Sequence, residues 1–233
     1  MSVPDELADK PFVRVFAAQD KWYGLTPDGK VVNPASGTDR WDLPEFEKPV
    51  VDMVLGRMNH FALHADGSFT QWAQHEKYYG PPPDGLKRVR GFAAANGNTI
   101  ALLMNGGAHV FGRTLIKEGG GRYNDRANVL GDVKLAATDS QQCYFVTKEN
   151  EVIATKVLNG EKRGGITDGL EGKNIIATAS PCQGYGCLFL TDKGKVYSAG
   201  GAPRPPADLP PARQIRFGAQ IGAAQMGDGT WRI

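Results

Sequence analysis

The feature that most constrains the fold of this chain is a short turn that recurs along the sequence. An Asp-Gly pair or a close variant lies between apolar runs in TPDGKVV at Thr26, HADGSFTQW at His64, TDKGKVY at Thr191 and MGDGTW at Met226. Such a pair predicts a β-hairpin, because these residues adopt the positive φ angles that a tight two-residue turn requires. Its recurrence indicates a repeated structural unit.

Six copies of the unit appear when the sequence is aligned on the turn. Each copy has an apolar run, a short polar loop, a second apolar run, the turn and a third short run. The turn residues are Gly29, Gly67, Gly106, Asn150, Gly194 and Gly229, at steps of 38, 39, 44, 44 and 35 residues. Asparagine can replace glycine here because it tolerates left-handed backbone geometry. The runs are short and rich in β-branched and aromatic residues, which predicts strands rather than helices.

A period of about 40 residues with three or four strands per copy is typical of a β-propeller. We therefore predict an all-β, six-bladed β-propeller that forms a single domain over residues 1–233. The blades are predicted on repeats near residues 12–37, 50–74, 88–113, 132–156, 173–201 and 212–233. The last copy stops soon after Gly229, so we expect the segment from Val3 to Phe12 to close the ring by donating a strand to it.

Two copies, VVDMVLGRMNHFALHADGSFTQWAQ and IIATASPCQGYGCLFLTDKGKVYSAGG, resemble the repeat of the regulator of chromosome condensation family. The resemblance implies a β-propeller. The chain departs from the family pattern by lacking its Gly-Gln-Leu-Gly type segment and by having six copies rather than seven. His60 keeps the histidine of the repeat, and its place in the other copies is taken by Trp22, Thr99, Cys143, Cys187 and Gly222. A thinner resemblance links DKWYGLTPDGKVV to the core of tectonin-type lectin propellers, which implies sugar binding.

Composition and charge give no sign of a nucleic-acid or membrane partner. The chain is 41% hydrophobic and 22% charged, with a formal net charge of +2, which is typical of a globular protein without a strongly basic surface. No signal peptide and no 18-residue apolar stretch is visible, so we predict a soluble, cytoplasmic protein. Cys182 and Cys187 could form a bridge, but an odd count of three cysteines favours reduced thiols.

The sequence contains no recognisable catalytic constellation. The four histidines, at positions 60, 64, 75 and 109, lack cysteines or carboxylates at metal-ligand spacing, which favours rings that pack or hydrogen-bond at blade surfaces. The GGGR stretch at Gly119 lacks the Gly-Lys-Ser/Thr ending of a phosphate-binding loop, and no GxSxG motif is present. We predict a protein that is not an enzyme and that has no metal and no cofactor.

The loop between the first and second strands of each copy is the best candidate for a binding surface. A propeller returns these loops to one face, where their amide-rich side chains would form a ring suited to a polar partner such as a protein backbone or a sugar. The alternative is that the amides only satisfy the backbones of neighbouring loops. The predicted binding residues are Lys21, Arg57, Asn59, Asn98, Gln142 and Tyr185, and the secondary candidates on connections between copies are Tyr78, Tyr79, Arg113 and Arg122.

These observations together predict a non-catalytic β-propeller that binds another protein, as a subunit or adaptor of a larger assembly. One alternative is a carbohydrate-binding lectin, for which aromatic platforms at equivalent places in each blade are expected. Against it, Trp22, Trp72 and Trp231 occupy different places in their copies and Trp41 lies in a connection. The other alternative is a guanine-nucleotide exchange or chromatin-binding factor, on the family resemblance.

Overall fold

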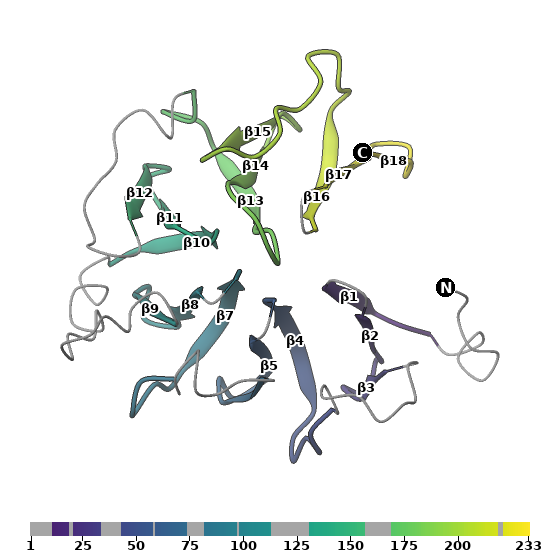
Figure 1. Ribbon diagram of the computed structural model, residues 1–233, viewed down its shortest axis with the longest axis vertical. Coiled ribbons are helices and arrows are strands. Elements are labelled where there is room, and N and C mark those ends of the chain that lie inside the picture. The colour runs from purple at the N-terminus through teal and green to yellow at the C-terminus, as the bar shows by residue number, and fades with distance from the viewer. Residues whose placement is uncertain are drawn as a thin grey trace.

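The computed structural model describes residues 11–18, 21–33, 43–57, 59–73, 82–96, 98–112, 131–156, 169–218 and 221–233. Within these residues the chain is all-β, with six separate three-stranded antiparallel sheets and no helix. The sheets stand around a common centre, toward which the first strand of each one points (Figure 1). The prediction of an all-β, six-bladed propeller is confirmed.

Each blade is a meander of consecutive strands, numbered here in chain order. Blades 1 to 3 consist of β1 (Arg14–Ala18), β2 (Lys21–Leu25) and β3 (Val31–Val32); β4 (Val50–Leu55), β5 (Asn59–His64) and β6 (Phe69–Ala73); and β7 (Val89–Ala94), β8 (Asn98–Leu103) and β9 (Ala108–Gly112). Blades 4 to 6 consist of β10 (Val133–Thr138), β11 (Gln142–Thr147) and β12 (Val152–Lys156); β13 (Ile175–Ala179), β14 (Cys187–Thr191) and β15 (Val196–Ala199); and β16 (Ala212–Phe217), β17 (Gly222–Met226) and β18 (Trp231–Arg232).

The turn between the second and third strands has the same geometry in all six blades. The six residues predicted to adopt left-handed geometry all have positive φ, between 64° at Asn150 and 89° at Gly106. The residues before two of these glycines, Asp28 and Asp66, do not have positive φ. In the turn of blade 2, Gly67 N–H donates to His64 O, and His64 N–H donates to Ser68 O. The turn is therefore a three-residue loop with one left-handed residue, and the predicted two-residue turn is wrong, because the strands pair one residue further apart.

The turn residue also joins its blade to the next one. The carbonyl groups of Gly29, Gly67, Gly106 and Gly194 accept hydrogen bonds from the first residue of the next inner strand, at 2.8 to 3.0 Å. The receiving strands carry a β-bulge directly after this residue, as between Val50 and Asp52 or between Val89 and Gly91. One glycine thus both reverses the chain and links two blades.

Large apolar side chains fill the spaces between successive blades. Phe61 of β5 stacks on Phe92 of β7 with 4.8 Å between ring centroids, and Tyr144 of β11 meets Phe189 of β14 edge to face. Phe61 and Tyr144 lie six residues before their turn residue, as do Tyr23, Ile100 and Leu188. The core is therefore a series of layers between blades, each built from the same position of the repeat.

The junction of blade 6 with blade 1 differs from the others in its exposed apolar side chains. Val13 and Val15 of blade 1 and Ile221 and Trp231 of blade 6 are all exposed. Phe12 packs edge to face on Trp22 of its own blade. Residues 3–10 of the segment from Val3 to Phe12 lie outside the described residues, so closure by this segment stays a prediction.

Candidate functional site

The first inner loops return to one face of the propeller, as the repeat predicts. In four blades the loop closes with the same bond: the N–H of Gly56, Ala95, Asp139 and Gly218 donates to the carbonyl three residues later. In blade 5 the loop is longer, running from Ser180 to Gly186 between β13 and β14. In the described parts of blades 2 to 6, the face therefore consists of short, uniform hairpins with one insertion in blade 5.

Three of the predicted binding residues are buried between the blades. Asn59, Asn98 and Gln142 begin the middle strands of blades 2, 3 and 4 and have almost no exposed surface. The Asn59 amide donates to the Thr99 hydroxyl of blade 3, and the Asn98 amide donates to the Asp139 carbonyl of blade 4. This departs from the prediction of an exposed amide ring. The middle strand begins at these residues, and its alternation turns their side chains toward the next blade.

The long loop of blade 5, from Ser180 to Gly186, is hydrogen-bonded to a buried carboxylate of blade 4. One oxygen of Asp139 accepts hydrogen bonds from Gln141 N–H and Gln142 N–H, and the other accepts from Gly186 N–H at 2.7 Å. The N–H and hydroxyl of Ser140 both donate to Gly184 O. Burial raises the pKa of Asp139, against the opposing effect of these backbone donors. Asp139 thus holds the long loop in one conformation.

Tyr185 is presented by this fastened loop. It lies between Gly184 and Gly186, which have φ angles of 122° and 79° and whose backbone groups are the ones bound by blade 4. The Tyr185 side chain is 58% exposed. The loop therefore holds an exposed aromatic side chain on a fixed backbone.

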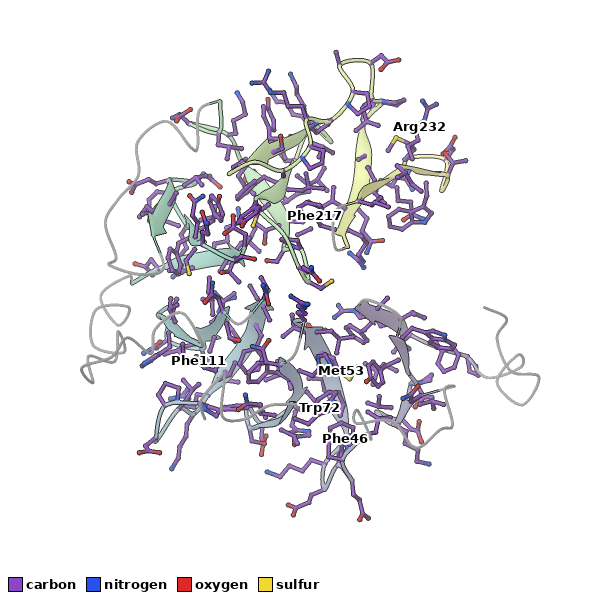
Figure 2. All side chains as sticks on the ribbon, in the orientation of Figure 1. Phe46, Met53, Trp72, Phe111, Phe217 and Arg232 are labelled. Atoms are coloured by element: carbon purple, nitrogen blue, oxygen red, sulfur yellow. The ribbon has the colours of Figure 1, made fainter. Side chains whose placement is uncertain are left out.

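Tyr185 lines a hollow of about 430 Å³ that crosses four blades. The other lining residues are Asn96 of blade 3, Ser140 of blade 4, Gln183, Gly184, Gly201 and Pro203 of blade 5, and Phe217 of blade 6. Figure 2 shows Phe217 at the inner part of blade 6, on the side of blade 5. The lining mixes an aromatic ring, a proline and amide or hydroxyl groups, which is the chemistry of a protein-binding surface.

Sequence reasoning missed Asn96 and Ser140 by two residues. It selected Asn98 and Gln142 from the same loops, but the tips of the hairpins lie earlier in the chain. The pairing of Ala94 with Thr99 and of Thr138 with Cys143 places the tips at residues 95–98 and 139–142. A prediction that placed the tip of each first inner loop two residues earlier would have selected Asn96 and Ser140.

The remaining predicted residues contribute less to this hollow. Arg57 is half-buried in the loop of blade 2, and its Nε atom is buried and has no hydrogen-bond partner among the described residues. The side chain of Lys21 lies outside the described part of the structure. Tyr78, Tyr79, Arg113 and Arg122 lie outside the described residues, so their part in binding stays a prediction.

Histidines and cysteines in the described residues serve packing. His60 meets Tyr23 and Trp72 edge to face, and the ring nitrogens of His64 lie within hydrogen-bond distance of Pro49 O and the Thr70 hydroxyl. The three cysteines are free and buried, and burial raises the pKa of Cys143 to about 12. Nowhere in the described residues do three or more metal-ligating side chains gather. No helix there could cross a membrane.

No family model matches the sequence, and no curated protein sequence is significantly similar to it. Solved structures are similar in fold. Yeast RCC1 (Prp20), in its complex with Kap60, matches with a TM-score of 0.69 and 13% identity over 94% of this chain and 69% of that chain. Human WBSCR16 matches with a TM-score of 0.68 and 13% identity over 91% of this chain and 71% of that chain.

A second structure of Prp20p, from Saccharomyces cerevisiae and described with its binding to Gsp1p and histones, gives a TM-score of 0.68 at 13% identity, over 94% of this chain and 70% of that chain. At such identity the likeness concerns the fold. It agrees with the six sheets and with the repeat that the sequence displays. The chain has the fold of an RCC1-like β-propeller.

Proposed function

We propose that this chain is a non-catalytic protein-interaction module, a subunit or adaptor of a larger assembly, that binds its partner on the face of the inner loops. The observation that carries the proposal is Tyr185, an exposed aromatic side chain on a loop that blade 4 holds in place. Such a side chain loses little conformational entropy on binding and is a frequent energetic anchor of interfaces.

The hollow beside Tyr185 supports a protein as the partner. Asn96, Ser140 and Gln183 offer hydrogen-bond donors and acceptors next to the phenol ring and to Phe217, and this mixture suits a peptide backbone with an apolar side chain. The neighbour Prp20 is itself described with the protein partners Kap60, Gsp1p and histones. A propeller face that binds proteins is therefore in keeping with the fold.

The test is site-specific photocrosslinking in native extract, with benzoylphenylalanine at position 185 and, as the matched control, at position 104. Met104 is also exposed but lies in the turn between β8 and β9. We expect a protein that crosslinks at position 185 and not at position 104. The same adducts from both positions would contradict a specific site at Tyr185.

The partner is then purified and its affinity measured for three variants. Tyr185→Ala should weaken binding at least tenfold, Tyr185→Phe should weaken it less, and Met104→Ala should leave it unchanged. Equal affinities for all three variants would overturn the proposal. Binding to a glycan array that depends on Tyr185, without a protein adduct, would favour the lectin alternative.

A further inference from the structure

A second hollow lies between blades 5 and 6 and shares Pro203 with the lining of the hollow beside Tyr185. Its volume is about 350 Å³, at the lower end of the range of small-molecule sites. Its walls are mostly apolar, with Leu188 and Val196 from blade 5, Ile221 and Ala224 from blade 6, and Pro206 and Leu209 from the connection between them. We refer to it as the blade 5–6 pocket.

The pocket lies where blade 6 carries small residues and blade 2 carries a large ring at the first of the two repeat positions. Gly222 takes the repeat position of His60, and Ala224 follows it on the same face of β17. Between blades 1 and 2, the corresponding space is filled by the rings of His60 and Trp72 together with Phe46 from the connection.

The outer wall of the pocket is stiff. The connection from β15 to β16 contributes Pro203, Pro205 and Pro206, and Leu209 N–H bonds back to Pro206 O at 3.2 Å. Proline fixes φ, so this wall has few other conformations to adopt. Ile233 at the rim is 88% exposed and does not fill the space. The pocket is therefore already shaped before a ligand arrives.

Two arginines complete the lining. Arg204 belongs to the connection and Arg232 to β18, and both line the pocket. Neither forms a salt bridge within the described residues. Figure 2 shows Arg232 on the outer side of blade 6, beside β18. Hydrogen bonds from Thr230 and, to a lesser extent, the charge of Arg232 lower the pKa of Asp228. Two guanidinium groups without a salt bridge beside an apolar hollow attract an anion, and a carboxylate matches their paired N–H donors.

We propose that the blade 5–6 pocket binds a small amphipathic carboxylate, with its aliphatic body between Leu188, Val196 and Leu209 and its carboxylate at Arg204 and Arg232. The apolar walls account for the body of the ligand, and the two cations account for its head. The size of the hollow favours a small molecule over a folded segment of another protein.

The test measures binding of dodecanoate and of dodecanol to the full chain by titration calorimetry. The wild-type chain should bind dodecanoate at least tenfold more tightly than dodecanol. The double variant Arg204→Gln with Arg232→Gln should lose at least tenfold in affinity for dodecanoate and change less than twofold for dodecanol. Leu209→Asp should weaken both ligands, because it places a carboxylate in the apolar wall.

The matched control is Arg213→Gln, which removes an exposed arginine of the same blade that does not line the pocket. It should leave dodecanoate binding unchanged, and circular dichroism should show the wild-type fold for every variant. The proposal is overturned if the wild-type chain binds no dodecanoate, if the double variant binds it as tightly, or if Arg213→Gln weakens it equally. Tighter binding of an octapeptide with a free C-terminal leucine than of dodecanoate would also overturn it, by assigning the pocket to a peptide.

Discussion

The contact between blades 2 and 3 and the junction of blade 6 with blade 1 use the same repeat positions in opposite ways. Between blades 2 and 3, Phe61 is fully buried and stacks on Phe92. Six residues before its turn, blade 6 has Ala223 instead, preceded two positions earlier by Ile221, which is 61% exposed. The backbone conformation is the same in both blades, whereas the stabilisation at each contact between blades depends on the side chain at this position.

The turn residues show the same contrast. Gly67 O accepts a hydrogen bond from Val89 N–H of the next blade at 3.0 Å. Gly229 O accepts one from the side chain of Gln225 in its own blade at 3.2 Å. A β-propeller is therefore held by interfaces of unequal strength, and a sequence repeat alone does not rank them.

The largest expected effect is the loss of a filled interface. Phe61→Ala should lower the free energy of unfolding by about 3 to 5 kcal/mol, because it leaves a cavity against Phe92 and Phe111. Val15→Ala, at a side chain that is 56% exposed at the junction, should cost no more than about 0.5 kcal/mol. Urea denaturation measures both, and similar costs would show that the two regions are equally packed.

The second prediction compares two turns of the same conformation. Gly67 has φ of 79° and a Cβ there would lie 3.0 Å from Arg88 Cα, whereas Gly229 has φ of 88° with open space around it. Gly229→Val should cost about 1 kcal/mol through backbone strain alone, and Gly67→Val should cost about 2 to 3 kcal/mol because the neighbouring strand must also move. Thermal unfolding tests the order, and a larger cost at Gly229 would contradict it.

A third prediction concerns the carboxylate that joins blades 4 and 5. Asp139→Asn should destabilise by about 1 to 3 kcal/mol, because an amide N–H₂ cannot accept the bonds that both carboxylate oxygens receive. The pKa of Asp139 is raised by burial, so the folded state binds the proton more tightly than the unfolded chain. Stability from this group is present below the unfolded pKa of 3.8 and falls as the pH rises through the folded value.

The cost of Asp139→Asn should therefore be greater near pH 3.5 than at pH 7, as measured by urea unfolding at both values. Asp132→Asn is the matched control, because that carboxylate is exposed and lies directly before β10 of the same blade. Its cost should stay small at both pH values. A cost of Asp139→Asn that grows with pH would reverse the sign argued here.

The smallest effect is expected at the exposed edge of blade 6. Ile221→Ser should change the free energy of unfolding by less than about 0.5 kcal/mol, since its side chain is mostly exposed. Leu190→Ser, at a fully buried place in the preceding blade, is the comparison and should cost several times more. A loss above about 2 kcal/mol at Ile221 would mean that another segment covers this edge in solution.

The sequence by itself determined the number of blades, the strand order and the six left-handed turn residues. These depend on local physics: alternating apolar runs predict strands, and glycine or asparagine at a fixed spacing is required where φ is positive. Asn150 illustrates this, because it was found by its place in the repeat and has φ of 64°. Tyr185, on the predicted loop face, is exposed, and its part in binding stays a prediction.

Only the tertiary structure decided which loop side chains are exposed. Asn59 and Asn98 look like surface amides in the sequence, yet the next blade covers them and takes their hydrogen bonds. Asp139 accepts bonds from its own loop at Gln141 and Gln142, but its bond from Gly186 N–H has no local signal in the sequence, because Gly186 belongs to another blade. Burial and pairing across blades depend on neighbours about 40 residues away, and this is why one-dimensional periodicity placed the blades but could not assign the roles of their polar residues.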